Sequence, residues 1–374
     1  MRRIKVLRVV IGLNQGGVQQ GVFNLCRGLD PERFEPIACA IENSGAIGND
    51  IEAAGFEVIV LGYKRQFWQA VLALVSLMRE RKIDIVHASS YHPSLYARLA
   101  AFIARVPVIL GYEHVKFDNN RKQRVLVNKL LLPITNGFTS VGQTVADQVS
   151  DWYGYPRNKV HIVHNGVDTD RFKPVTSRRQ AKLGLGLDPD KPVVGYVSRL
   201  NQEKGHRFLF DAIAELSQKY DVQWLVVGEG REQKLIHQQA QERAVLEKII
   251  FTGIRRDIPE LLSAFDVHVF PTLQEGFPNV LLEAMSAGCA NVTSDFPGNL
   301  EIAKHQHNAL IVPMGNAKAL AQSIEKLILD EPLAERLRQQ ARQDIVQNFS
   351  LQAYADKMSA LYMSLLKQQG VNID

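Results

Sequence analysis

Short apolar runs alternate with longer stretches of helical periodicity from one end of the chain to the other. The strands predicted in the first half are Val6–Ile11, Pro36–Ala40, Glu57–Leu61, Ile83–His87, Val106–Leu110, Gly137–Ser140 and Val160–Val163. Helical patterns such as Gln66–Arg81 and Pro93–Arg105 separate them. This alternation predicts βαβα units, and therefore a parallel, doubly wound sheet.

The periodicity lapses at Asn165–Val175 (NGVDTDRFKPV), which is rich in turn residues and contains a proline. We interpret it as a linker. A second series of strands follows at Pro192–Val197, Gln223–Val227, Ile249–Phe251, Val267–Phe270, Ala290–Thr293 and Ala309–Val312. Helices predicted at Ala317–Leu329, Leu333–Asn348 and Leu351–Gln368 close the chain.

A chain of 374 residues suits two cores of ordinary size. We predict a first Rossmann-like domain over 1–167, a second over 168–350, and a C-terminal helix within 351–374 that packs back on the first. The fold class is α/β, with two doubly wound parallel-sheet domains facing across a cleft. Ligands of such sheets bind outside the carboxyl ends of the strands, so the candidate residues should lie in loops that directly follow strands.

The loop after the first strand is rich in glycine and precedes a helix. It contains Gly16 and Gly17, which would let the backbone approach a phosphate at the helix N-terminus. The spacing differs from the dinucleotide-binding fingerprint, so a tight turn without a ligand is the alternative.

A pair of cations follows strand Pro192–Val197. Arg199 and Lys204 lie five residues apart in the loop, with Gly205 at the start of the next helix. A guanidinium offers a planar fork to phosphate oxygens and an ammonium offers a point charge. Solvated surface cations are the alternative for any such pair.

The stretch Phe270–Gly288 (FPTLQEGFPNVLLEAMSAG) places two carboxylates around a helix N-terminus. Glu275 lies in the loop and Glu283 lies inside the helix. The amides of Asn279–Leu281 would begin that helix, where unpaired N–H groups and the dipole favour an anion. This arrangement suits a ligand that carries phosphates between two hydroxylated rings.

Two further glycine turns end strands of the second half. Gly228 follows Gln223–Val227 and Ile254 follows Gly253, and both turns could line a nucleotide base through backbone groups. Plain βα turns are the alternative.

The histidines, cysteines and acids do not indicate a metal site. His114 follows strand Val106–Leu110 and is the histidine best placed for catalysis, whereas His87 could belong to the core. No His/Cys cluster has zinc spacing, and the three cysteines suit reduced thiols. Asp168 and Asp170 form a D-x-D sequence, but they lie in the linker, where a turn or helix cap is expected.

Positive charge is concentrated in the first half of the chain, which suggests an anionic membrane as a partner. The first 170 residues hold 20 Lys and Arg against 15 Asp and Glu. The densest segment is Lys116–Lys129, a predicted basic helix that could lie on an anionic membrane surface; a helix with one core side and one solvated side is the alternative. No nucleic-acid-binding motif is present.

The N-terminal apolar run is too short for a signal peptide, and the run at Ala70–Met78 is too short for a membrane span. We therefore expect a cytoplasmic protein that can be peripheral on the inner face of the membrane.

Taken in order, these motifs resemble glycosyltransferase family 4, which has the GT-B fold. The resemblance covers nearly the whole chain and is carried as a set by GYVSRLNQEKG, VGEG, EGFPNVLLEAMSAG and the NGVDTDRF linker. It implies a retaining, metal-independent transfer of a hexose-type sugar from a nucleoside-diphosphate sugar to a saccharide or lipid-linked acceptor in cell-surface polysaccharide or lipopolysaccharide synthesis. UDP is favoured over GDP by its frequency in the family alone.

The resemblance also implies residue roles. Arg199 and Lys204 would hold the diphosphate, Glu275 would bind donor-sugar hydroxyls, Glu283 would bind the ribose, and His114 would contact the donor sugar. The implied donor-binding set is Gly16, Gly17, Gly228, Ile254, Phe277, Asn279, Val280, Leu281 and Glu283. Val115 follows His114 where the family usually has an acid. Without a second well-placed carboxylate, retention suggests front-face attack.

Two other functions suit parts of the same pattern. A sugar-nucleotide epimerase could share the double-Rossmann plan, and it would turn over donor without an acceptor. A non-catalytic sugar-binding protein of the periplasmic type would carry a signal peptide and would not need Arg199 and Lys204.

Overall fold

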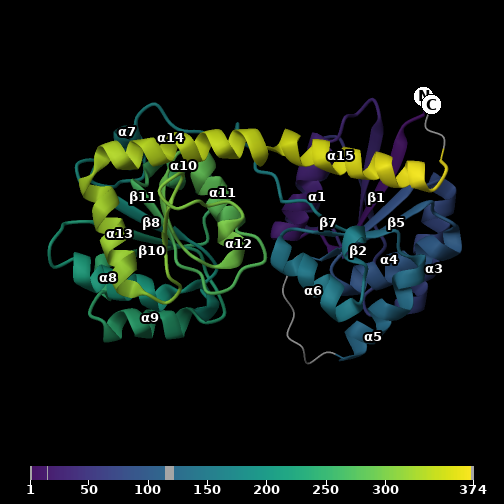
Figure 1. The fold of residues 1–374 in the computed structure, drawn as a ribbon, viewed down its shortest axis with the longest axis horizontal. Coiled ribbons are helices and arrows are strands. Elements are labelled where there is room, and N and C mark those ends of the chain that lie inside the picture. The colour runs from purple at the N-terminus through teal and green to yellow at the C-terminus, as the bar shows by residue number, and fades with distance from the viewer. Residues whose placement is uncertain (1, 15, 114–121, 372–374) are drawn as a thin grey trace. The chain divides into compact units, whose positions relative to one another are not determined.

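The chain folds into two compact units in a computed structural model that describes residues 2–14, 16–113 and 122–371. Unit 1 comprises Met1–Gly166 together with Leu351–Asp374, and unit 2 comprises Val167–Ser350 (Figure 1). Each unit is built around its own parallel sheet, so each is described separately.

Unit 1 contains a seven-stranded sheet in the order β3-β2-β1-β4-β5-β6-β7. The strands are β1 Ile4–Gly12, β2 Phe34–Asn43, β3 Glu57–Val60, β4 Ile85–Ser89, β5 Val108–Glu113, β6 Gly137–Ser140 and β7 Val160–Ile162. All neighbouring strands are parallel. The order reverses between β1 and β4, which is the switch point of a doubly wound sheet.

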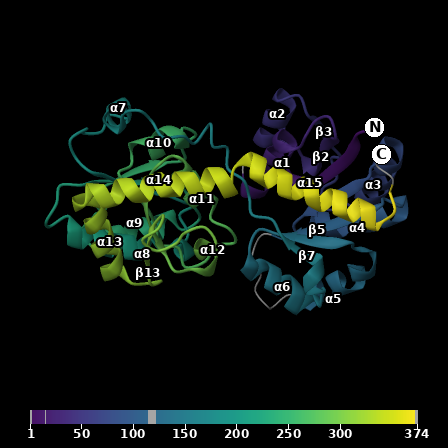
Figure 2. The same cartoon turned by 45° about the horizontal axis from the view of Figure 1, so that its top comes forward.

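Helices cover both faces of this sheet. Their bounds are α1 Gly17–Gly28, α2 Gly45–Ala53, α3 Phe67–Arg81, α4 Tyr91–Ala104, α5 Lys122–Leu131, α6 Gln143–Tyr153 and α15 Leu351–Gln368. Helices α3 and α4 pack on one core layer, and α1 and α15 share another, in which Leu25 meets Tyr354 and Tyr362. The C-terminal helix therefore belongs to unit 1, where it lies beside α1 (Figure 2).

Unit 2 contains a six-stranded parallel sheet in the order β10-β9-β8-β11-β12-β13. The strands are β8 Val193–Val197, β9 Gln223–Val227, β10 Ile249–Gly253, β11 Val267–Phe270, β12 Ala290–Ser294 and β13 Leu310–Val312. The helices are α7 Arg178–Gly184, α8 His206–Leu216, α9 Gln233–Glu242, α10 Ile258–Ala264, α11 Asn279–Ser286, α12 Pro297–Leu300, α13 Ala317–Leu329 and α14 Glu331–Asn348.

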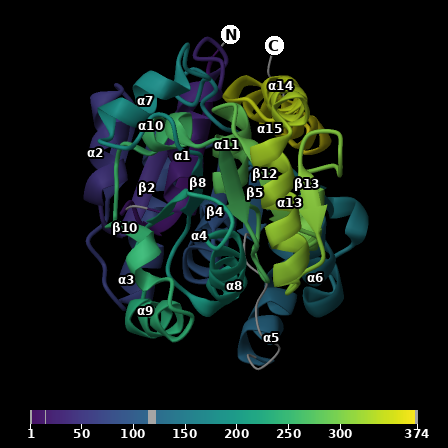
Figure 3. The ribbon, with the colours of Figure 1, turned by 90° about the vertical axis from the view of Figure 1, so that its left-hand side faces the viewer.

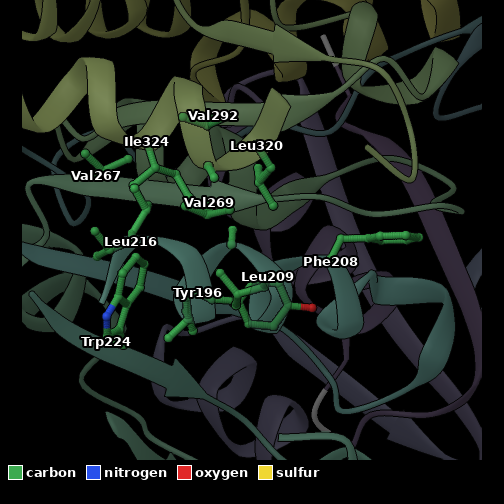
Figure 4. Packing of buried hydrophobic residues seen from close by; sticks show 14 of the residues in the cluster. Tyr196, Phe208, Leu209, Leu216, Trp224, Val267, Val269, Val292, Leu320 and Ile324 are labelled. Carbon is green, nitrogen blue, oxygen red and sulfur yellow. The ribbon is translucent and has the colours of Figure 1, made fainter. Parts of the chain in front are cut away.

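The core of unit 2 lies between its sheet and helices α8 and α13, which pack side by side (Figure 3). Tyr196 and Trp224 from the strands meet Leu209, Leu216 and Ile324 from these helices, as Figure 4 shows. The burial of strands on both faces explains why the sequence shows continuous apolar runs rather than strict alternation.

The predicted pair of doubly wound parallel sheets is confirmed, and two strands begin later than expected. Strands β4 and β5 start at Ile85 and Val108, two residues beyond the predicted starts. The carboxylate of Asp84, just before β4, accepts hydrogen bonds from the Arg2 guanidinium and the Lys5 amide. Pro107 has no N–H to offer a ladder.

The two-residue shift moves His87 away from the end of its strand. It lies in the middle of β4, where its ring nitrogens are 2.7 Å from the hydroxyls of Tyr362 and Thr139. Burial, assisted by the nearby Arg8 guanidinium, holds the pKa of His87 well below its ordinary value. His87 is therefore a neutral core residue that helps to bind α15 to the sheet.

Candidate functional site

The switch point of unit 2 brings together two loops that are far apart in sequence. Strands β8 and β11 are neighbours, with Val194 paired to Val267. The loop after β8 carries Arg199 and Lys204, and the loop after β11 carries Glu275. Both loops therefore leave the same carboxyl edge of the sheet, where ligands of this architecture bind.

Lys204 and Glu275 form the centre of the site. The Lys204 ammonium lies 2.5 Å from Oε2 of Glu275 and 3.5 Å from the carbonyl oxygen of Gln274. The Lys204 side chain is only 6% exposed and that of Glu275 is 23% exposed. The second carboxylate oxygen of Glu275 accepts a hydrogen bond from the Gly276 amide at 3.2 Å. The Lys204 ammonium is thus buried beneath the Glu275 carboxylate, which is the more exposed partner of the pair.

The two loops are fastened by backbone contacts that the sequence did not indicate. The Glu203 carbonyl accepts the Leu273 amide at 2.8 Å and the Thr272 hydroxyl at 3.2 Å. Gly205 has a φ of 77°, and a Cβ there would lie 2.0 Å from the Pro271 carbonyl oxygen. Only glycine permits this approach, which places Lys204 against the loop that carries Glu275.

Arg199 is the exposed cation of the site. Its side chain makes no hydrogen bond or ion pair with any of the described residues, and its carbonyl accepts the Asn201 amide at 2.9 Å. A charged, unpaired guanidinium at the carboxyl edge is free to form two parallel hydrogen bonds to an oxyanion.

The first turn of α11 offers fewer amides than the sequence suggested. The Asn279 amide donates to the Phe277 carbonyl at 3.0 Å, and the Leu281 amide donates to the Pro278 carbonyl at 3.0 Å. Val280 carries the first-turn amide that has no partner among the described residues. The helix dipole still favours an anion here, but direct hydrogen bonding is concentrated at Val280.

Glu283 lies one turn further along α11. Burial raises its pKa to about 7, and the Arg171 guanidinium opposes this effect. Arg171 lies in the linker, where no sequence motif marks it as a site residue. The carboxylate can therefore gain or lose its proton near neutral pH, which makes its hydrogen-bonding capacity depend on pH.

Three further residues of the predicted donor-binding set differ in their surroundings. Gly228 has a φ of 124°, donates its amide to the Gly253 carbonyl, and would place a Cβ 2.1 Å from the Ser198 carbonyl oxygen. Its amide is therefore occupied, and the absence of a Cβ lets the loop approach Ser198. Ile254 is 63% exposed at the end of β10, whereas Phe277 is buried with its ring 6.5 Å from that of Phe349.

The glycine loop of unit 1 follows β1 at the carboxyl edge of its own sheet. Gly16 is the N-cap of α1 with an extended φ of 169°, and Gly17 is the first helical residue. The Gln19 side chain donates to the Gly12 carbonyl at 3.1 Å and spans the loop. The conformation at Gly16 does not itself require glycine. His114 lies outside the described residues.

The D-x-D sequence forms a turn. Oδ1 of Asp168 accepts the backbone amides of Asp170 and Arg171 at 3.2 and 3.0 Å. Across residues 2–14, 16–113 and 122–371, no group of three His, Cys, Asp or Glu side chains is placed to hold a metal ion.

The basic segment of unit 1 is helical over Lys122–Leu131, and residues 116–121 lie outside the described part of the chain. Leu126 and Leu130 are exposed on this helix, together with Lys122 and Lys129, whereas Asn128 is buried. No helix in the described part of the chain combines the length and hydropathy of a bilayer span.

The switch point of a doubly wound sheet is where nucleotides and other ligands bind in α/β proteins, and here it carries two cations and a carboxylate. Two family models match the chain: glycosyltransferase family 4 over residues 15–171, and glycosyl transferases group 1 over residues 177–344. The chain belongs to this family of glycosyltransferases, whose fold is GT-B. The resemblance seen in the sequence is confirmed.

Two relatives and a solved structure match most of the chain. The UDP-Gal:α-D-GlcNAc-diphosphoundecaprenol α-1,3-galactosyltransferase of Escherichia coli is 27% identical over 310 residues, covering 80% of each protein. The N,N'-diacetylbacillosaminyl-diphospho-undecaprenol α-1,3-N-acetylgalactosaminyltransferase of Campylobacter jejuni is 27% identical over 338 residues, covering 84% of this chain and 87% of that enzyme. Anabaena HepE, solved with UDP and glucose, superposes with a TM-score of 0.85 at 23% identity, covering 97% of this chain and all of that one.

Proposed function

We propose that this glycosyltransferase moves a hexose-type sugar, with retention, from a nucleoside-diphosphate sugar to a saccharide or lipid-linked acceptor in cell-surface polysaccharide or lipopolysaccharide synthesis. The two relatives support this class of acceptor, because both are named for transfer to a diphosphoundecaprenol-linked sugar. The observation that carries the proposal is the Lys204–Glu275 pair at the switch point of unit 2, with the unpaired Arg199 guanidinium on the same loop.

The two cations suit the departing diphosphate. Breaking the bond between the anomeric carbon and the phosphate oxygen places negative charge on the leaving group. In this proposal Arg199 and Lys204 stabilise that charge, together with the Val280 amide and the dipole of α11. Removing one preorganised donor of this kind typically costs about 3–4 kcal/mol, or a factor of about 100–1,000 in rate.

Glu275 is better suited to binding hydroxyls than to nucleophilic attack. One carboxylate oxygen is held by the Lys204 ammonium and the other by the Gly276 amide, so its negative charge is partly neutralised, while each oxygen keeps a lone pair that can accept a hydroxyl. We therefore propose that the acceptor attacks from the face that the diphosphate leaves, and that a phosphate oxygen takes the acceptor's proton. A covalent glycosyl adduct on Glu275, trapped and located by mass spectrometry, would overturn this mechanism.

The base and ribose are assigned to the α10–α11 side of the site. Ile254 offers exposed apolar surface to a base, and Glu283 would bind ribose hydroxyls. We propose UDP rather than GDP as the nucleotide of the donor, because the E. coli relative is named for UDP-Gal. Gly16 and Gly17 of unit 1, and His114, keep their proposed roles toward the diphosphate and the donor sugar. No step of the proposed reaction is assigned to a metal ion.

An acceptor on a lipid would place the enzyme at an anionic membrane surface. Exposed Leu126 and Leu130 beside Lys122 and Lys129 on α5 support this part of the proposal, since basic amphipathic helices bind anionic bilayers. Sedimentation with phosphatidylglycerol vesicles at low salt should retain the protein. A Leu126→Gln, Leu130→Gln variant should bind less, and the absence of any binding by the parent would refute the membrane part alone.

The main test is calorimetry with UDP and with GDP, followed by a donor screen with and without acceptor. We expect tighter binding of UDP, a product formed only when the acceptor is present, and loss of transfer in Arg199→Ala, Lys204→Ala. Donor epimerised without acceptor would instead indicate the epimerase. Transfer at the parent rate by the double variant would refute the assignment of the site.

A further inference from the structure

A cavity lies at the amino edge of the unit 1 sheet, the edge opposite the glycine loop. Its volume is about 720 Å³, within the range of small-molecule sites, and it is formed where β1, β4 and β5 begin and where α3 and α4 end. The cavity is rich in positive charge. Its cations are Arg2, Arg3, Lys5, Arg79, Lys82 and Arg105.

The two acids of the cavity pair with only three of these six cations. Asp84 accepts both terminal nitrogens of Arg2, at 2.6 and 2.8 Å. Glu35 pairs with Arg3 at 3.1 Å and with Lys5 at 3.7 Å. The pairs leave three cations, Arg79, Lys82 and Arg105, without a carboxylate partner among the described residues; Arg79 donates to the Ile103 carbonyl instead. Like charges are therefore held together in one hollow.

Chain geometry directs two of these unpaired cations to the cavity. Lys82 and Arg105 are the C-caps of α3 and α4, with left-handed φ values of 52° and 62°. This conformation usually selects glycine or asparagine, and here both positions carry a long basic side chain. Cations at helix C-termini are favourable in themselves. That effect acts on each helix separately. It does not explain why the Lys82 and Arg105 side chains line the same cavity as Arg79.

We propose that this cavity binds a phosphorylated ligand through Arg79, Lys82 and Arg105. Two or more anionic oxygens would match the three unpaired cations, and guanidinium groups bind phosphate with paired hydrogen bonds. The described lining contains no aromatic side chain on which a base could stack, and its floor is aliphatic, from Met78, Ile83 and Val106. A phosphate ester of a small aliphatic group therefore fits better than a nucleotide.

This site is separate from the one proposed for transfer. The glycine loop follows the carboxyl end of β1, whereas the cavity begins at its amino end; nine residues of strand place the two on the order of 25 Å apart. The cavity site does not rest on the proposed function, and it would position or regulate the enzyme rather than take part in the reaction.

The test is calorimetric titration of the full-length protein with pyrophosphate at low ionic strength. It is performed in an Arg199→Ala, Lys204→Ala background, so that the proposed donor site does not contribute. We expect binding that weakens about tenfold in Lys82→Asn, Arg105→Asn, since the variant removes two of the three cations that would contact the phosphate. Asparagine tolerates the left-handed backbone, so the fold should persist, which circular dichroism would verify. Transfer by the Lys82→Asn, Arg105→Asn variant in the parent background should be unchanged.

The matched control is Lys64→Gln, Arg65→Asn, which removes the same charge from the same unit outside the cavity, also with one left-handed residue at φ 60°. The control should bind pyrophosphate like its background protein. Absence of pyrophosphate binding, or equal weakening in the control and the cavity variant, would overturn the proposal.

A second arm identifies the source of the phosphate. The protein is sedimented with phosphatidylglycerol vesicles, and the bound fraction that is lost in Lys82→Asn, Arg105→Asn is measured. Release of this fraction by added glycerol phosphate would support a lipid headgroup as the ligand. Competition between glycerol phosphate and pyrophosphate without any such vesicle-bound fraction would support a soluble phosphate ester.

Discussion

Replacing Glu275 by glutamine tests the central pair of the site. In the structure the Lys204 ammonium has two oxygen partners, Glu275 at 2.5 Å and the Gln274 carbonyl at 3.5 Å. The Lys204 side chain is 6% exposed, so water cannot easily replace the lost carboxylate. Glu275→Gln therefore leaves a buried ammonium with incomplete compensation of its charge.

The expected cost follows from this burial. Removing one partner of a fully buried ion pair costs about 3–5 kcal/mol. Because Glu275 is 23% exposed and a glutamine oxygen can still accept a hydrogen bond, we expect about 2 kcal/mol for unit 2. For a unit of this size, that loss corresponds to a decrease of about 4–8 °C in Tm.

A bound diphosphate should reverse this loss. The freed ammonium needs an anion, so we expect UDP to bind Glu275→Gln at least as tightly as the parent and to restore most of its Tm. Sugar transfer should nevertheless fall by a factor of about 100 or more, because the donor-sugar contact is lost. Lys204→Met should lose both UDP affinity and transfer. Calorimetry and thermal unfolding with and without UDP measure these effects.

A control removes a carboxylate of the same charge from the surface. Glu247 is exposed on unit 2 with no ion-pair partner among the described residues, so Glu247→Gln should change neither Tm nor UDP binding. The reasoning fails if Glu275→Gln weakens UDP binding as much as Lys204→Met does, since the carboxylate would then not be competing with phosphate for the ammonium.

Three further predictions follow from the same structure. Gly205→Ala should lower the stability of unit 2 by about 2–4 kcal/mol in urea unfolding, because the added Cβ would lie 2.0 Å from the Pro271 carbonyl oxygen at a positive φ; an unchanged midpoint would contradict this contact. The KM for donor should rise as pH falls through about 7 while Glu283 gains its proton, and Glu283→Gln should abolish that dependence in steady-state assays. Burial raises the pKa of Glu113 to about 7 from 4.5, and the Tyr153 hydrogen bond and the Arg98 charge oppose this shift. The protonated Glu113 side chain therefore contributes fully to stability below about pH 4.5, and this contribution is lost as pH rises through 7. Because 2.5 pKa units correspond to about 3 kcal/mol, Glu113→Gln should flatten the stability profile between about pH 4.5 and 7, and an unaltered slope would refute the assignment.

The fold could be predicted because its signal is local. Each buried strand needs a short run of apolar residues and each covering helix needs one apolar face, so the alternation of the two shows at the level of neighbouring residues. Even so, the starts of β4 and β5 were misplaced by two residues. The Asp84 side chain accepts hydrogen bonds from Arg2 and Lys5 ahead of β4, and no local pattern announces a contact 79 or 82 residues away.

Which backbone amides of the candidate site are free to bind a ligand could not be predicted in the same way. The sequence indicated free amides at Asn279 and Leu281, and the structure shows that Phe277 and Pro278 accept both of them. It suggested that backbone groups of the Gly228 turn would be available to a ligand, and the structure shows that the Gly228 amide donates to the Gly253 carbonyl. These outcomes depend on how a loop closes on itself, which is set by contacts that residue types do not specify.

The sequence by itself determined the two parallel sheets, the order of the strands and helices, and the loops that carry the candidate chemistry, because all of these follow from periodicity and turn residues. The tertiary structure decided that Lys204 and Glu275, 71 residues apart, form one ion pair, and that basic residues from the start of β1 and the ends of α3 and α4 line one cavity. The physical reason is that strand order in a sheet selects which chain ends become neighbours, and that choice minimises the free energy of the whole unit rather than of any segment.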